Sequence, residues 1–269
     1  MNKESEDMKR RRIWKIEAFF LMFLVGITIF SGCVEKAPTE TTTTSTIIIL
    51  VRHGETDWNA LGILQGQANT TLNDVGVTQM EDLGASWEKN VGLNVDVVYS
   101  SPSLRAKQAA EILCKYLSIS PFEIKLNDNL QEMGLGILTG VPKAEIPSNP
   151  EYLDIYKQWI TDLDYAQPSG QAAEISDYTK HYLEGKEFSG ESLNTIQTRA
   201  WNALNEIVEE NKGKIILVSS HGGIIKVILC KVTDTPLNEY SKFSVSNAST
   251  TILEFKSDGT VIWVNAPES

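Results

Sequence analysis

The sequence predicts an α/β fold: a three-layer α/β/α sandwich with a mainly parallel sheet, one antiparallel edge and a small cap insertion. From position 45 onward, apolar runs rich in β-branched residues alternate with amphipathic stretches of helical period, as in parallel sheets covered by helices. Only Lys256-Ser257-Asp258-Gly259 separates the last two runs, and this turn is typical of an antiparallel hairpin. With 269 residues, 42% of them hydrophobic, the chain can bury a sizeable core.

The predicted elements follow one another in a regular order. Strands are expected at 46–51, 95–99, 122–126, 215–219, 250–255 and 260–264. Helices are expected where apolar residues recur three or four positions apart: Met80, Leu83 and Trp87; Ala109, Leu113 and Leu117; Leu193, Ile196, Ala200, Leu204 and Ile207; and a buried run at 224–232. The stretch 142–188 has weaker periodicity and is interpreted as the cap of a domain that spans 46–269.

The N-terminal residues 1–32 differ from the rest of the chain. A basic cluster, Lys9 to Arg12, precedes an uncharged apolar stretch at 18–32, which is the order of a secretory signal. This stretch is shorter than the roughly 20 apolar residues that a membrane-spanning helix needs. Phe30-Ser31-Gly32-Cys33 resembles the lipobox of secreted lipoproteins, although Phe30 departs from the usual leucine. Two alternatives stay open: an uncleaved membrane anchor, or a Cys33 that merely lies near a cleavage site.

A threonine-rich segment at 33–45 follows and contains too few apolar residues to pack a core, so we expect a tether. Each alternative for the N-terminus places the following domain outside the cytoplasm, because the positive charges stay inside. The sequence therefore predicts an extracytoplasmic protein that is anchored to the cell membrane through its N-terminal segment or through a lipidated Cys33.

Charge, cysteine and histidine counts exclude several classes of partner. The net charge of -11 makes nucleic acid an unlikely ligand, since its phosphate backbone is negative. Cys114 and Cys230 lie in apolar surroundings and are expected to be buried thiols, with a disulfide left open. The three histidines lie far apart in the sequence, so no metal site is predicted. His181, in the cap, is interpreted as an ordinary surface or packing residue.

Four segments carry charged or reactive side chains. Each lies just after a predicted strand or just past the next loop. They are 52–59, 99–106, 130–136 and 219–223. Because ligands of open α/β sheets bind outside the carboxyl ends of the strands, we expect the four segments to converge in one crevice. Together they offer two imidazoles, two guanidinium groups and two carboxylates. This positive pocket in an acidic protein suits a phosphate, whose oxygens match the fork of an arginine.

The same segments resemble the histidine phosphatase superfamily, which includes cofactor-dependent phosphoglycerate mutase. The residues are RHGETDWN at 52–59, SSPSLRAKQAAE at 100–111, Glu132 with GLGILTG behind it, GES at 190–192 and SHGG at 220–223. The resemblance covers nearly all of 46–269, and four segments in the right order make it specific.

The resemblance implies a role for each matching residue. His53 would be the nucleophile that forms a phosphohistidine, which requires a neutral imidazole. Glu132 would protonate the leaving oxygen and then activate the attacking water. The remaining residues implied to bind the substrate are Arg52, Asn59, Gln65, Gly66, Arg105, His221 and Gly222, of which Arg52, Arg105 and His221 clamp the phosphate oxygens. No metal or other cofactor is implied, because the guanidinium groups supply the positive charge. Glu55 is interpreted as a supporting residue rather than a chemical one.

Several features favour a phosphatase over a mutase. Mutases follow the catalytic glutamate with Arg and Tyr residues that hold a second phosphate, whereas Met133-Gly134-Leu135 follows Glu132 here. The cap contains only four lysines, Lys143, Lys157, Lys180 and Lys186. Expected export also argues against a glycolytic substrate. The sequence therefore predicts a hydrolase of small phosphomonoesters; the alternatives are a phosphoglycerate mutase-type phosphotransferase and a catalytically inactive surface binding module.

Overall fold

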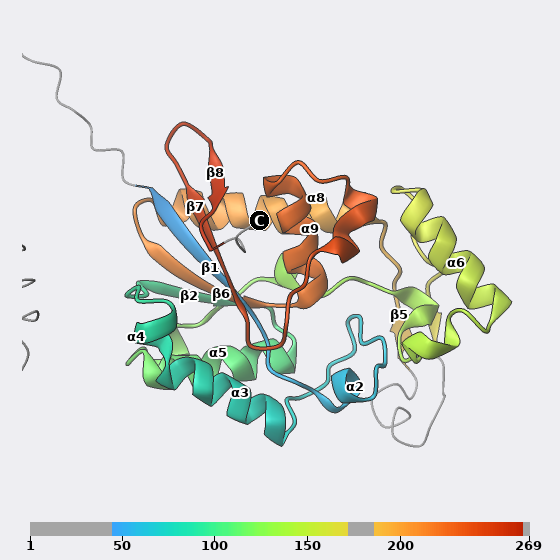
Figure 1. Ribbon diagram of the computed structural model, residues 1–269, viewed down its shortest axis with the longest axis horizontal. Helices are drawn as coiled ribbons and strands as arrows, with labels where there is room; N and C mark the ends of the chain where they lie inside the picture. The colour runs from blue at the N-terminus through green and yellow to red at the C-terminus, as the bar shows by residue number, and fades with distance from the viewer. Residues whose placement is uncertain (1–44, 172–185, 266–269) are drawn as a thin grey trace, which may run out of the picture. The chain divides into compact units, whose positions relative to one another are not determined.

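A single six-stranded sheet organises the structure, a computed structural model that describes residues 45–171 and 186–265 (Figure 1). Its strands are β1 (Thr46–Arg52), β2 (Val97–Ser100), β3 (Lys125–Leu126), β6 (Ile215–Ser220), β7 (Thr250–Phe255) and β8 (Val261–Trp263). They lie in the order β3-β2-β6-β1-β7-β8. The first four are parallel to one another, while β7 runs antiparallel to β1 and β8 antiparallel to β7. The predicted mainly parallel sheet with an antiparallel edge is confirmed.

Strand β1 is central because both of its faces are buried. Ile48 and Leu50 belong to one apolar cluster, and Ile49 and Val51 belong to another; all four side chains are fully buried. Since successive side chains of a strand point to opposite faces, the continuous apolar run fills two cores at once. The run ends where β1 reaches the carboxyl edge of the sheet, at Arg52 and His53.

Helices cover both faces of the sheet. In Figure 1, α3 (Asp74–Ala85), α4 (Trp87–Asn90) and α5 (Leu104–Tyr116) lie on one side, and α8 (Leu193–Glu210) and α9 (Gly222–Val232) lie on the other. Their apolar stripes supply the two cores: Met80, Trp87 and Leu113 face one, and Ile196, Leu204 and Ile228 face the other. The predicted three layers are therefore present. A short helix, α2 (Asp57–Ala60), follows β1 and begins with a capping box formed by Thr56 and Asn59.

The cap region contains several short elements. They are the 3₁₀ turns η3 (Gly136–Leu138) and η4 (Lys143–Glu145), helix α6 (Pro150–Thr161), and a two-stranded ribbon of β4 (Gly170–Gln171) and β5 (Glu187–Phe188). Residues 172–185, and His181 with them, lie outside the described residues. Further 3₁₀ turns are η1 (Pro121–Glu123), η2 (Asp128–Leu130) and η5 (Leu237–Lys242).

Two predicted boundaries are wrong, and both errors come from local turns. The strand expected at 122–126 is reduced to Lys125–Leu126, because Pro121 begins a 3₁₀ turn that leaves Phe122 99% exposed. The single stripe of Met80, Leu83 and Trp87 is shared by two helices, since α3 ends at Ala85 and α4 begins at Trp87.

Cys114 and Cys230 are free and buried, as predicted. Burial, with nearby Glu111 and Glu123, raises the pKa of Cys114 to about 11; burial and nearby Glu239 do the same for Cys230. The N-terminal signal, the tether and Cys33 lie outside the described residues. Within 45–171 and 186–265, no helix is long and apolar enough to cross a membrane.

Candidate active site

His53 is placed by the end of the central strand. Its backbone N–H donates to the carbonyl of Ser220 at 3.1 Å, which ties it to the end of β6, and its side chain is only 2% exposed. The ring Nδ1 lies 2.6 Å from the carbonyl oxygen of Gly54. A carbonyl can only accept, so Nδ1 carries the proton and Nε2 is unprotonated, with a lone pair that can accept. The backbone of the loop therefore selects the tautomer in which Nε2 carries no proton.

The surroundings of His53 also keep the ring neutral. Burial lowers its pKa well below 6.5, and the charges of Arg105 and Arg52 lower it further, against the opposing effect of the bond to Gly54. The protonated form would have to lie without water beside two guanidinium groups. The imidazole is consequently neutral at physiological pH.

Arg105, near the start of α5, is fully buried and held in one geometry. Its guanidinium donates to the carbonyl oxygens of Ala68 (2.6 Å) and Gly66 (2.9 Å), and its Nε–H donates to Nε2 of His53 at 3.2 Å. Burial lowers its pKa to about 10, with Arg52 acting in the same sense and Glu132 opposing. Because backbone carbonyls hold it and no carboxylate of the described residues forms an ion pair with it, its charge remains available to an anion.

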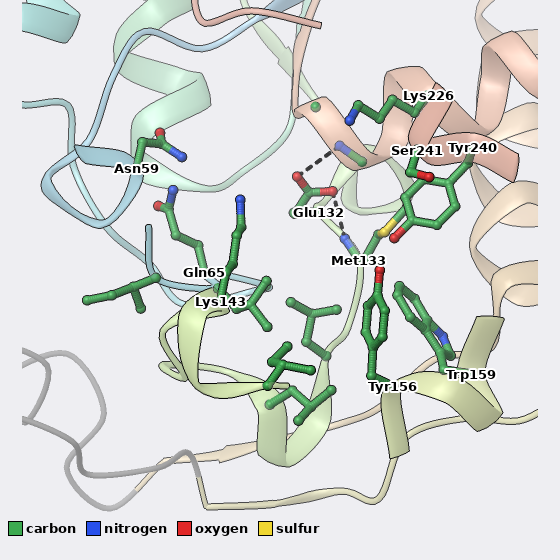
Figure 2. A pocket seen from close by; sticks show the side chains of 18 of the residues that line it. Asn59, Gln65, Glu132, Met133, Lys143, Tyr156, Trp159, Lys226, Tyr240 and Ser241 are labelled. Atoms are coloured by element: carbon green, nitrogen blue, oxygen red, sulfur yellow. Dashed lines mark hydrogen bonds between the residues drawn. The ribbon is translucent and has the colours of Figure 1, made fainter. Parts of the chain in front are cut away.

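Glu132 is held by backbone N–H groups rather than by a cation. One carboxylate oxygen accepts from the N–H of Met133 at 3.0 Å, and the other accepts from the N–H of Gly223, in the first turn of α9, at 3.2 Å (Figure 2). A Cβ atom on Gly223 would lie 2.4 Å from the carboxylate, so any other residue at this position would displace the side chain of Glu132. The second glycine of SHGG thus makes room for Glu132.

Arg199, on α8, fixes the loop that carries Glu132. Its guanidinium forms two bonds of 2.7 and 2.8 Å with the carboxylate of Glu191 and donates to the backbone carbonyls of Asn129, Gln131 and Glu132. Glu191 in turn accepts from the N–H of Gly134 at 2.7 Å. This network explains the GES segment at 190–192, whose glutamate bridges the loop and α8.

His221, the residue before α9, lies behind His53. The two ring centroids are 5.3 Å apart in an edge-to-face arrangement. Nε2 of His221 lies 2.9 Å from the hydroxyl of Ser101, and Nδ1 has no partner among the described residues. Burial, followed by the charges of Arg105 and His53, lowers its pKa well below 6.5. Its unpaired Nδ1 is buried within the protein.

A cavity of about 530 Å³ connects most of these groups. Of the residues predicted from sequence, those lining it are Arg52, His53, Asn59, Gln65, Gly66, Arg105, Glu132 and Gly222. His221 is fully buried and does not line the cavity. The predicted convergence of four distant segments is therefore observed, with His221 set back from the surface of the site.

Asn59 turns its amide nitrogen toward the cavity (Figure 2). Its side-chain oxygen is occupied by Thr56, in the capping box, and by Asn247 at 3.2 Å. With the oxygen already bonded, the orientation leaves the NH₂ group to donate.

Gly54 and Glu55, which follow His53, have structural contacts outside the cavity. Glu55 does not line the cavity and accepts from Asn73, which caps α3, at 3.0 Å, so its supporting interpretation agrees with its position. Gly54 is required by packing, because a Cβ at this position would lie 2.3 Å from the carbonyl oxygen of Gly76. Gly54 therefore allows close packing against α3.

Sequence reasoning missed several lining residues. Lys226 faces the cavity one turn after Gly222, and the aromatic rings of Tyr156, Trp159 and Tyr240 line it from α6 and η5. The four-residue spacing between Gly222 and Lys226 was the one available signal for Lys226. In the described part of the chain no group of three or more His, Cys, Asp or Glu side chains is placed to hold a metal ion.

Comparison with known proteins agrees with this geometry. A sequence profile of the Histidine phosphatase superfamily (branch 1) matches residues 48–266. The chain belongs to the histidine phosphatase superfamily. It is 32% identical over 222 residues to the metal-independent phosphoserine phosphatase of Arabidopsis thaliana, covering 81% of this chain and 79% of that protein. It is 31% identical over 180 residues to phosphoglycerate mutase-like protein 4 of the same plant, covering 66% of this chain and 67% of that protein.

Solved structures show the same histidine phosphatase fold. A phosphoserine phosphatase of Entamoeba histolytica, in complex with phosphoserine, superposes with a TM-score of 0.63 at 25% identity, over 82% of this chain and 95% of that one. The same enzyme has also been solved with 3-phosphoglyceric acid. That enzyme has therefore been observed with both phosphoserine and 3-phosphoglyceric acid bound.

Proposed function

We propose that this chain hydrolyses small phosphomonoesters through a phosphohistidine intermediate on His53. The observation that carries the proposal is the state of His53: it is buried, neutral and protonated on Nδ1, and it lines a cavity together with Arg52, Arg105 and Glu132. A neutral imidazole in this tautomer is ready to attack phosphorus without first losing a proton.

In the first step, Nε2 of His53 forms a bond to phosphorus while the bond to the alcohol oxygen breaks. Arg52 and Arg105 stabilise the charge on the phosphoryl oxygens, and the side-chain amide of Asn59 supplies a further hydrogen bond. Glu132, protonated, donates its proton to the departing alcohol oxygen. The phosphoryl group is then bonded to His53, and Glu132 is a carboxylate.

In the second step, water attacks the phosphorus of the phosphohistidine. The carboxylate of Glu132 takes a proton from that water, the nitrogen–phosphorus bond breaks, and inorganic phosphate leaves. His53 returns to its neutral form and Glu132 regains its proton, so the cycle closes. The two N–H groups that hold Glu132 place one carboxyl group to serve in both steps.

Acid-quench labelling tests the mechanism. We expect a substrate labelled in its phosphate to leave an acid-labile, alkali-stable label on the protein, and we expect His53→Ala to remove both label and turnover. Turnover without a protein-bound label would overturn the covalent mechanism. The absence of turnover with every phosphomonoester, together with ligand binding that His53→Ala leaves unchanged, would favour the inactive binding module.

A mutase remains the second candidate because two lysines, Lys143 and Lys226, line the cavity and could accept a second phosphate. Met133-Gly134-Leu135 provides no cation after Glu132, which favours hydrolysis. Assays on 3-phosphoglycerate decide between them: release of inorganic phosphate supports the phosphatase, and isomerisation without release supports the mutase. The relatives suggest phosphoserine and 3-phosphoglycerate as the first esters to assay.

We further propose that the domain begins near Thr46, that residues 33–45 tether it, and that the N-terminal segment or a lipidated Cys33 anchors it outside the cytoplasm. The charge order of residues 1–32 supports this proposal.

A further inference from the structure

The cavity extends well beyond the groups that would surround a phosphate. On one side of Glu132 and Met133, three aromatic rings stand together: Tyr156 and Trp159 from α6, and Tyr240 from η5 (Figure 2). The ring centroids of Tyr156 and Trp159 are 6.3 Å apart, and those of Trp159 and Tyr240 are 6.1 Å apart in an edge-to-face contact. Leu135 and Leu138 continue this apolar wall. Trp159 is itself buried, so the half-buried rings of Tyr156 and Tyr240 offer the surface that the body of a substrate would contact.

The aromatic wall is a fixed part of the cap. The indole N–H of Trp159 donates to the backbone carbonyl of Glu191 at 2.8 Å, which anchors the ring to the loop that also binds Arg199. Burial, the neighbouring Tyr156 and a hydrogen bond with it raise the pKa of Tyr240, so this phenol stays neutral. A preformed apolar wall of this kind favours a ligand with an apolar body, because contact removes both surfaces from water.

Lys226 gives the same cavity a cation that the phosphate does not require. It is half-buried on α9, and no described side chain lies within ion-pair or hydrogen-bond distance of its ammonium group. Burial lowers its pKa, as do the charges of Arg52 and Lys143, while Glu132 opposes them. In Figure 2 the ammonium group points toward the space beside Glu132. Lys143, exposed at the mouth, adds a further positive charge.

Among the described lining residues Glu132 is the single carboxylate, so the charges there are unbalanced. A phosphate would engage Arg52 and Arg105 and leave Lys226 without a counter-ion. A second anion on the substrate, close to the ester oxygen that Glu132 protonates, would neutralise it. A carboxylate meets this need because it can pair with one ammonium group through charge-assisted hydrogen bonds.

We propose that this site selects phosphate esters of α-hydroxy acids with an aromatic or branched apolar side chain: the carboxylate pairs with Lys226, and the side chain packs on the wall of Tyr156, Trp159 and Tyr240. The proposal rests on the phosphatase function proposed above. This substrate preference would distinguish the chain from enzymes whose substrates have a small polar group attached to the phosphate.

Three matched esters test the two halves of the proposal separately. They are the phosphate esters of phenyllactate, phenyllactamide and lactate. The phenyllactamide ester lacks the carboxylate charge, and the lactate ester lacks the ring. We expect kcat/KM for the phenyllactate ester to exceed that for each of the others by about tenfold, as one half-buried ion pair or one packed ring would give.

Variants assign each preference to its residue. Lys226→Gln should abolish the preference for carboxylate over amide, whereas Lys231→Gln, an exposed lysine on the same helix, should retain it. Tyr156→Ala should abolish the preference for phenyllactate over lactate. Equal rates for the acid and the amide, a carboxylate preference that survives Lys226→Gln, or a lactate ester as good as the phenyllactate ester would overturn the proposal.

Failure of the enzyme and failure of this specificity are distinguishable. If no ester is hydrolysed, the phosphatase function fails, but the esters stay intact and calorimetry can measure their binding to the same proteins. The same tenfold ratios should then appear in Kd and respond to the same variants. Equal affinities for the three esters would refute the proposed specificity.

Discussion

At the residue scale, the two buried histidines should make folding stability sensitive to pH. Their pKa values lie well below 6.5 in the folded state because the rings are buried beside guanidinium groups. In the unfolded chain they titrate near 6.5, so between the two values the unfolded state binds more protons. The stabilising contribution is therefore present above about pH 6.5 and is lost as the pH falls toward the folded-state pKa values.

We expect the free energy of unfolding to fall between about pH 7 and pH 5.5, by at most about 1.4 kcal/mol per pH unit for each histidine. Urea unfolding at several pH values measures this, and ordinary carboxylates titrate below the window. His53→Gln and His221→Gln should each flatten the slope. A slope that neither variant changes would show that these rings are not held neutral.

The residues of the site were predictable to different degrees. His53, Arg105 and Glu132 could be predicted because each follows a recognisable strand or opens a helix within a specific motif. The set-back position of His221 depends on how α9 packs behind β1, which the local sequence does not encode. The local sequence does not reveal the role of Gly54 either, because the residue packs against the carbonyl of Gly76, 22 positions further along the chain.

At the element scale, α8 should position the catalytic loop through Arg199. The guanidinium makes five hydrogen bonds, to the Glu191 carboxylate and to three backbone carbonyls around Glu132. Arg199→Met removes all five, and we expect kcat to fall about tenfold or more with little change in KM, because the misplaced group donates a proton rather than binds the substrate.

A conservative change separates positioning from simple destabilisation. Arg199→Lys keeps the charge and part of the bonding, so it should recover part of kcat. As a control, Lys212→Met breaks an exposed ion pair with Glu209 and should leave kcat and stability nearly unchanged. If Arg199→Met raised KM instead and left kcat intact, a positioning role for Arg199 would be wrong.

The elements themselves were predicted best where apolar periodicity was long. Strands β1, β6 and β7 and helices α5, α8 and α9 have regular patterns, and the sequence indicates them correctly. Strand β3 was overextended because Phe122 is apolar and β-favouring, while Pro121 starts a 3₁₀ turn that exposes it. A short apolar run gives no indication of whether tertiary packing will cover it.

At the scale of the whole domain, the convergence of four segments follows from topology. Parallel strands present their carboxyl ends at one edge, so the segments after β1, β2, β3 and β6 had to meet there. No comparable topological rule predicts the part of the cavity that contains the aromatic wall. It is lined from cap and loop elements by Lys143, Tyr156, Trp159 and Tyr240. The placement of these elements depends on packing between distant segments, so the sequence predicted a phosphate site but not the aromatic wall beside it.

The N-terminal segment calls for a test on the full chain. The basic cluster, the short apolar stretch and Cys33 predict a lipidated anchor, with the domain from Thr46 onward outside the membrane. We expect full-length protein expressed in a bacterium to enter the detergent phase on phase partitioning and to incorporate labelled palmitate, because a diacylated cysteine holds a protein stably at a bilayer.

Cys33→Ser distinguishes the three N-terminal alternatives. For a lipoprotein, the variant should lose the palmitate label and retain its uncleaved N-terminus. For an uncleaved anchor, wild type and variant should behave alike, both unlabelled and both in the detergent phase. For a plain secretory signal, both should be cleaved and partition into water. A chain starting at Val34 should stay in the aqueous phase and hydrolyse phosphomonoesters, since both apolar cores of the described domain form from residues after Ser45.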